Sequence, residues 1–153
     1  MQLAELLSRT GLDVLSHLSR SVTVPVIDGL QAQGDLIVIP AGFVPQIRMS
    51  WFGARDVPPG GVELVRGVAG NNPHTLVADP GTCQWTRGVH DSQRLGVAAF
   101  VNTAPVYLIH PEHGGTGVAP GTWVVRRQRE SFNGSMGPSE NFGFAGRTVL
   151  VAD

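Results

Sequence analysis

The amino-acid sequence predicts a mainly β protein, a small barrel or sandwich with a short helical arm at its N-terminus. Short apolar runs recur after residue 20, and clusters such as Pro58-Pro59-Gly60-Gly61 and Asp79-Pro80-Gly81 separate them. No helical pattern of about 10–15 residues lies between these runs, which argues against parallel α/β units. Many short strands divided by turns are typical of sandwiches and barrels. We therefore expect a helical arm over residues 1–20 and a single β-rich domain over residues 21–153.

Residues 2–19 have the periodicity of an amphipathic helix. Apolar residues recur there at three- and four-residue spacing, at Leu3, Leu6, Leu7, Val14, Leu15 and Leu18. Gly11 interrupts the pattern, so we expect two short helices or one kinked helix. The apolar stripe has two alternatives: it packs on the chain's own β domain, or it docks on a neighbouring subunit.

Eight segments are expected to form strands. They cover residues 22–26, 36–39, 62–65, 75–78, 95–101, 105–109, 122–127 and 148–152. Pro25 indicates that the first of them lies at a sheet edge. Residues 131–146 form a glycine-rich loop whose phenylalanines are costly to leave in water. The apolar residues expected to contact other chains are Leu3, Leu6, Leu7, Phe132, Phe142 and Phe144.

The composition limits the class of partner. The chain has 153 residues, 42% of them hydrophobic, and its charged fraction of 15% is below the usual value of about 25%. This balance favours a surface covered by other protein chains, in a homo-oligomer or a shell. The net charge of −1 gives no electrostatic basis for binding nucleic acid or an acidic membrane. All 11 basic residues are arginine, which indicates a GC-rich genome such as that of an actinobacterium or its phages.

No targeting signal is evident in the sequence. The N-terminus lacks the basic and apolar regions of a signal peptide, and no apolar run reaches the ~18 residues of a membrane span. We therefore expect a cytoplasmic protein, or one in a virion or other particle assembled in the cytoplasm. The single cysteine, Cys83, excludes an internal disulfide and a multi-cysteine zinc site.

The segment His110-Pro111-Glu112-His113 is the candidate for a metal site. Histidine and carboxylate are ligands that zinc accepts, and His74 is the best third ligand in the sequence. The alternative is that the histidines organise a turn by donating hydrogen bonds to its backbone carbonyls, while Glu112 faces solvent or an arginine such as Arg126. We favour this alternative because no acidic residue is spaced to complete a ligand set. The sequence thus predicts no cofactor, with zinc as the alternative.

Residues 123–130 alternate in the manner of a strand. Trp123 and Val125 share one face and Val124 lies on the other, so at least one of these faces points inward. The arginines that follow either bind phosphate or pair with acidic residues on neighbouring strands, and the net charge of −1 favours pairing.

Several segments together are similar to a known family. They are Gln33-Gly34-Asp35, Asn72-Pro73-His74-Thr75, His110-Pro111-Glu112-His113-Gly114, residues 119–130 and Val151-Ala152-Asp153. This pattern resembles a family of small uncharacterised bacterial and phage proteins, over residues 31–153. Members carry a Gly-His-x-His pair in the middle, whereas here only His74 stands there, which weakens a shared metal site. The resemblance implies a compact β fold and no activity.

No catalytic residues are predicted, because no arrangement of nucleophile, base and orienting acid is evident. Asp35 is either a site acid or part of the turn that begins a strand. The sequence therefore predicts a non-enzymatic structural or interaction module, a subunit of a larger assembly such as a phage capsid, in a decoration or accessory role. The alternative is a metal-binding domain built on His110, His113 and His74, with hydrolase activity as its extension.

Overall fold

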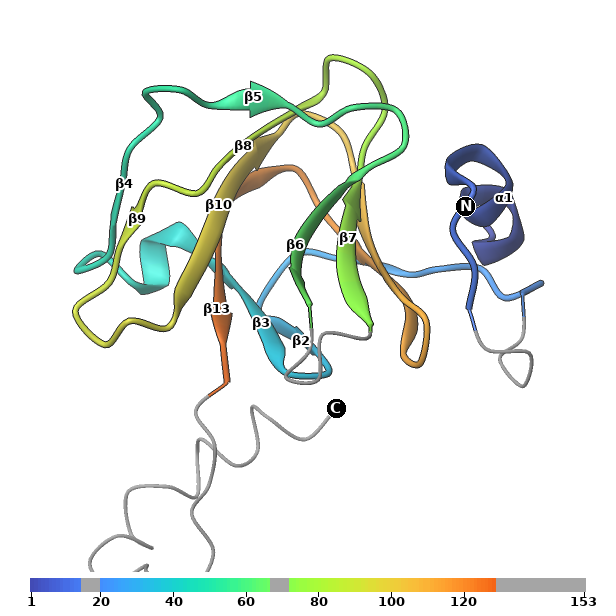
Figure 1. Cartoon of the computed structure of the whole chain (residues 1–153), viewed down its shortest axis with the longest axis horizontal. Helices are drawn as coiled ribbons and strands as arrows, with labels where there is room; N and C mark the ends of the chain where they lie inside the picture. The colour runs from blue at the N-terminus through green and yellow to red at the C-terminus, as the bar shows by residue number, and fades with distance from the viewer. Residues whose placement is uncertain (15–19, 67–71, 129–153) are drawn as a thin grey trace, which may run out of the picture.

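The computed structural model describes residues 1–14, 20–66 and 72–128, with the side chain of Arg66 excepted (Figure 1). Two β-sheets pack face to face as a sandwich, and one short helix lies against the outside of one of them. The predicted mainly β fold is therefore confirmed. Among the described strands, neither sheet closes into a barrel. No helix in the described part of the chain is long and apolar enough to cross a membrane.

The strands form two large sheets and one small one. The five-stranded sheet has the order β1 (Val26–Ile27), β12 (Gly114–Val118), β11 (Val106–His110), β7 (Pro73–Val77) and β6 (Val62–Arg66). The six-stranded sheet has the order β2 (Gln31–Gln33), β3 (Leu36–Pro40), β13 (Gly121–Arg127), β10 (Gly96–Asn102), β8 (Cys83–Thr86) and β5 (Arg55–Asp56). The small sheet pairs β4 (Arg48–Met49) with β9 (Val89–His90), and a 3-10 helix, η1, covers Ala41–Phe43. Every pair of strands is antiparallel except β1 with β12.

The main core lies between the two large sheets. Trp123 and Val125 of β13 contribute to it beside Phe100 of β10, which is opposite Trp123 in the strand pairing. Leu76 and Leu108 contribute from the five-stranded sheet. Val124, on the other face of β13, is buried in a separate cluster under η1 and the small sheet. Both faces of β13 are therefore buried.

Helix α1 (Leu3–Thr10) packs on the outer face of the five-stranded sheet. Its three leucines share one face because residues three and four apart are neighbours on a helix. Leu3, Leu6 and Leu7 are buried against Val77, Tyr107 and Ile109. The stripe is thus covered by the chain's own β domain, and these three side chains are not available to another chain in this arrangement.

The helix ends where the sequence predicts. Gly11 adopts φ 73°, a left-handed conformation that glycine reaches at little cost, and its N–H donates to the carbonyl of Leu7. Residues 11–14 are not helical, so the expected break at Gly11 is present. Residues 15–19 lie outside the described part of the chain.

Six of the eight expected strands correspond closely to observed ones, namely β3, β6, β7, β10, β11 and β13. The first expected strand, residues 22–26, is reduced to the edge strand β1, which begins at Val26. Residues 20–24 instead accept and donate backbone hydrogen bonds with the arm, as in Leu3 N–H to Val22 O at 2.9 Å. The expected strand at 148–152 and the phenylalanines Phe132, Phe142 and Phe144 lie outside the described residues.

Arg126 is paired rather than free to bind phosphate. Its Nε lies 2.9 Å from Asp91 Oδ2 and one terminal nitrogen lies 3.2 Å from Asp91 Oδ1, a two-point contact. Burial acts to raise the pKa of Asp91, but hydrogen bonds from Arg126 and from the backbone of Gln93 and Leu95 outweigh it and lower the pKa. The sequence-based preference for pairing with an acidic residue is confirmed at this arginine.

Replacing Trp123 by alanine tests the orientation of β13. Trp123 is 2% exposed, and its Nε1–H donates to the carbonyl of Ala119 at 3.1 Å. We expect Trp123→Ala to lower the free energy of unfolding by about 3–5 kcal/mol, the range for truncating a buried aromatic residue. Urea unfolding measures it. Trp51→Ala, at a tryptophan that is 36% exposed, is the control and should cost much less; equal costs would contradict the assignment.

Candidate functional site

The three histidines singled out from the sequence lie side by side at one end of the sandwich. His74 begins β7, His110 ends β11, and His113 lies in the turn that leads to β12. The ring centroids of His74 and His110 are 4.4 Å apart, and those of His110 and His113 are 4.6 Å apart. The hairpin between β2 and β3 lies beside the start of β7 in Figure 1 and brings Gln33 and Asp35 to the same place. Segments distant in sequence therefore form one polar cluster.

His74 is held at both ring nitrogens. Its Nδ1 lies 3.0 Å from Gln33 Oε1, and its Nε2 lies 2.9 Å from Asp35 Oδ1. The amide of Gln33 is oriented by its own donation from Nε2 to the carbonyl of Leu108 at 3.0 Å, which leaves Oε1 as an acceptor. Both partners of His74 are thus acceptors when Asp35 is ionised. The geometry then calls for a proton on each ring nitrogen, an imidazolium paired with Asp35.

His110 has the opposite role. Its Nδ1 accepts hydrogen bonds from the backbone N–H groups of Glu112 at 3.0 Å and His113 at 3.3 Å, so the proton of the neutral ring is on Nε2. Burial, followed by the neighbouring charges of His74 and His113, lowers the pKa of His110 to about 4. The ring is therefore neutral at pH 7 and organises the turn as an acceptor, where the sequence-based alternative expected a donor.

The β2–β3 turn allows the cluster to close. Gly34 has φ 57°, and a Cβ there would lie 2.8 Å from His113 Nε2 and 3.3 Å from His74 Cε1. On the outside of the cluster, Asn72 donates a hydrogen bond to Glu112. Glu112 is exposed, in line with the expectation that it faces solvent, and Arg126 pairs with Asp91 rather than with Glu112.

Hydrogen bonds engage ring nitrogens that a metal would need. A ring that carries protons on both nitrogens has no lone pair to donate, and His74 is in that position when it pairs with Asp35. The described residues contain no group of three or more His, Cys, Asp or Glu side chains that could hold a metal ion. The proposed ligands His110, His113 and His74 are thus neighbours, and a zinc site built on them stays a prediction.

Cys83 is placed as a core residue. It is buried in the main cluster, and burial together with the negative charge of Asp56 raises the pKa of its thiol to about 12. Because the thiolate is the reactive form, a thiol with such a pKa is inert near pH 7.

A second feature lies at the other sheet edge, in the turn between β4 and β5. The side chain of Phe52 is 97% exposed there, and its neighbour Trp51 is 36% exposed. The turn is fixed to the end of β8 and the residues after it, because the hydroxyl of Thr86 donates to Ser50 O at 2.9 Å and Ser50 N–H donates to Gly88 O at 2.7 Å. A rigid turn therefore holds an aromatic side chain in solvent.

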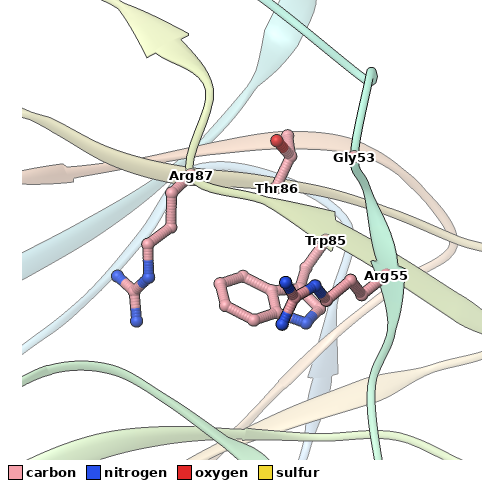
Figure 2. A pocket seen from close by; sticks show the side chains of 5 residues that line it. All are labelled: Gly53, Arg55, Trp85, Thr86 and Arg87. Atoms are coloured by element: carbon pink, nitrogen blue, oxygen red, sulfur yellow. The ribbon is translucent and has the colours of Figure 1, made fainter.

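Directly after Phe52, a pocket opens along β5 and β8. Its lining residues are Gly53, Arg55, Trp85, Thr86 and Arg87, and its volume is about 250 Å³ (Figure 2). Sequence reasoning missed this site. The available signal was the Trp-Phe-Gly triplet at 51–53, two adjacent aromatic residues followed by a turn residue outside any predicted strand. We call Trp51, Phe52 and the lining residues the aromatic–arginine surface.

Comparison with known proteins assigns the family. Residues 32–128 match the family model described as "Domain of unknown function (DUF8820)". The chain belongs to this family. The matched segment contains the histidine cluster and the aromatic–arginine surface, and the description of the family attributes no activity to either. No curated protein and no solved structure matches the chain.

The lowered pKa of His110 predicts a loss of stability in acid. The unfolded chain binds a proton at this residue near pH 6.5, and the folded chain does so only near pH 4. Unfolding therefore takes up a proton at His110 between these values, so this residue makes stability fall as the pH drops from about 6.5 to 4. Urea unfolding at several pH values measures this.

His110→Asn keeps a hydrogen-bond acceptor without a titrating ring, so its stability should depend less on pH in this window. The control is His90→Asn, at an exposed histidine of β9, which should retain the wild-type slope. An unchanged slope in His110→Asn would show that another group is responsible.

Gly34→Ala tests how tightly the cluster closes on the β2–β3 turn. The left-handed φ costs an alanine about 1 kcal/mol or more, and the new Cβ also displaces His113. Gly81→Ala is the matched control, because Gly81 has φ 75° with no atom within 4 Å of the added Cβ. We expect a larger loss of unfolding free energy at Gly34, and equal losses would mean that His113 moves aside freely.

Proposed function

We propose that this chain is a non-enzymatic interaction module, a subunit of a larger protein assembly that it contacts through the aromatic–arginine surface. The observation that carries the proposal is the 97% exposure of Phe52 on a turn tied to β8. Single exposed apolar residues are ordinary on protein surfaces. Here an exposed Phe adjoins an exposed Trp and a pocket with a third aromatic residue, Trp85.

The composition of this surface supports a role in binding protein. Aromatic residues and arginine are enriched among the residues that dominate interface energies. A side chain already held in position loses little conformational entropy on binding, so a fixed turn favours affinity. The hydrogen bonds of Ser50 and Thr86 supply that fixation. The low charged fraction of 15% is consistent with a chain whose surface is partly covered in its assembly.

The narrower expectation from the sequence, a decoration or accessory protein of a phage capsid, stays a prediction within this proposal. The apolar stripe of α1 does not support it, because Leu3, Leu6 and Leu7 are covered by the chain's own sheet. This supports the turn at 51–53, rather than the helix, as the proposed assembly surface.

Sedimentation of the protein in extracts of the cells that produce it tests the proposal. We expect the wild-type chain to sediment in a complex larger than its own mass of 16.2 kDa, and Phe52→Ser to shift it toward the monomer. Val26→Ser is the control, since Val26 is 42% exposed on the edge strand of the other large sheet. A monomeric wild-type protein, or equal effects of the two variants, would contradict the proposal.

A further inference from the structure

The pocket of the aromatic–arginine surface lies where the two large sheets meet at an open side of the sandwich. Arg55 of β5 is directly opposite Trp85 of β8, so both side chains leave the same face of the sheet. In Figure 2 the Arg87 side chain lies to one side of the Trp85 indole, and the Arg55 side chain reaches across the indole from β5. The pocket therefore has an aromatic wall and two guanidinium groups.

Arg87 is fixed in this position. Its two terminal nitrogens donate to the carbonyls of Leu64 at 3.0 Å and Glu63 at 2.8 Å, both in β6 of the facing sheet. Its guanidinium carbon lies 5.0 Å from the centroid of the Trp85 ring, a cation–π contact. A guanidinium has five N–H donors, and these two contacts engage two of them. The charge of Arg87 is not neutralised by either carbonyl.

The electrostatics of the pocket favour an anion. Two of its five lining residues are arginines and none is acidic. The acidic neighbour of Arg55 in the sequence, Asp56, points to the opposite face of the sheet, where Gln84 donates to it at 3.5 Å. Strand alternation thus separates the positive side chain from the negative one.

We propose that this pocket binds a carboxylate of the partner polypeptide, an Asp or Glu side chain that accepts hydrogen bonds from Arg55 near the positive charge of Arg87, with an adjacent apolar residue packed against Phe52. The inference rests on the proposed function and adds the chemistry of the partner. Arginine binds carboxylates through paired hydrogen bonds, and Phe52 directly precedes the pocket residue Gly53. An acidic residue beside an apolar one therefore matches both halves of the surface.

A polypeptide fits this surface better than a nucleic acid does. Nucleic-acid sites neutralise several phosphates with a basic stripe, whereas this pocket has two arginines and the chain has a net charge of −1. The exposed Phe52 and Trp51 add apolar area that a polypeptide side chain can cover.

Nuclear magnetic resonance titration of the full chain tests the inference, observed at the indole N–H of Trp85 and at the side-chain Nε–H of Arg55. The probe is a blocked tetrapeptide, acetyl-Gly-Glu-Leu-Gly-amide, and the matched control peptide has Gln in place of Glu. We expect saturable shifts with the Glu peptide and affinity at least about 10-fold weaker with the Gln peptide, because the charge-assisted contact is lost. The shifts should diminish as salt is raised.

Variants locate the binding. Arg55→Gln should weaken binding of the Glu peptide by about 5-fold or more, since an exposed ion pair contributes roughly 1 kcal/mol. Arg127→Gln, at an exposed arginine at the end of β13, should leave it unchanged. Arg87→Gln also removes the hydrogen bonds to β6, so the folding of this variant is checked before its binding is measured. The conclusion on the binding site therefore depends on Arg55→Gln.

Three results would overturn the inference: no saturable shift at Trp85, equal binding of the Gln peptide, or tighter binding of a ten-nucleotide oligothymidylate than of the Glu peptide. If one of these results is found while Phe52→Ser still abolishes assembly, the proposed function stands. Only the inference that the pocket binds a carboxylate is then rejected. A wild-type chain that sediments as a monomer would instead reject the proposed function itself.

Discussion

The packing of β10 and β13 against the five-stranded sheet is the contact on which the rest of the structure depends. Phe100 and Trp123 are opposite each other in the pairing of these two strands, and both are buried between the sheets. Each aromatic residue removes a large apolar area from water, which is the main favourable contribution to folding. With this pair in place, β3 pairs with β13 and β8 pairs with β10. The turn that precedes β3 contributes Asp35 to the histidine cluster, and β8 contributes Trp85 to the aromatic–arginine surface.

The histidine cluster shows how the sandwich closes one end with polar groups. Gln33 links three segments, because its amide donates to Leu108 O and accepts from His74. His74, only 1% exposed, is hydrogen-bonded to Asp35 and Gln33. A buried polar network of this kind is stable only when its members are satisfied. Its neighbour His110 accepts hydrogen bonds from the backbone of its own turn, and burial lowers the pKa of that ring.

The aromatic–arginine surface contrasts with that cluster. Its polar groups hold the backbone in place and leave the side chains available, as the Thr86 hydroxyl does for the turn that carries Phe52. Arg87 likewise uses two donors to fix its position and keeps its positive charge. These hydrogen bonds therefore fix the backbone and Arg87, while the side chain of Phe52 stays exposed.

The sequence by itself determined the fold class, the end of the helix and the central strands, because these depend on local patterns. The short apolar run Trp123-Val124-Val125 favours a strand, and glycine at position 11 favours the left-handed conformation that ends a helix. Short strands such as β2, β5 and β12 were missed, because Gly-rich or polar segments become strands only when a neighbour supplies hydrogen bonds.

The sequence also placed His74, His110 and His113 in one group. Only the tertiary structure decided their roles, since the protonation of a ring depends on partners that lie far away along the chain. For the same reason, only the tertiary structure shows that Phe52 is exposed and that Arg55 and Arg87 line one pocket with Trp85. These positions follow from strand pairing, which no local pattern in the sequence specifies.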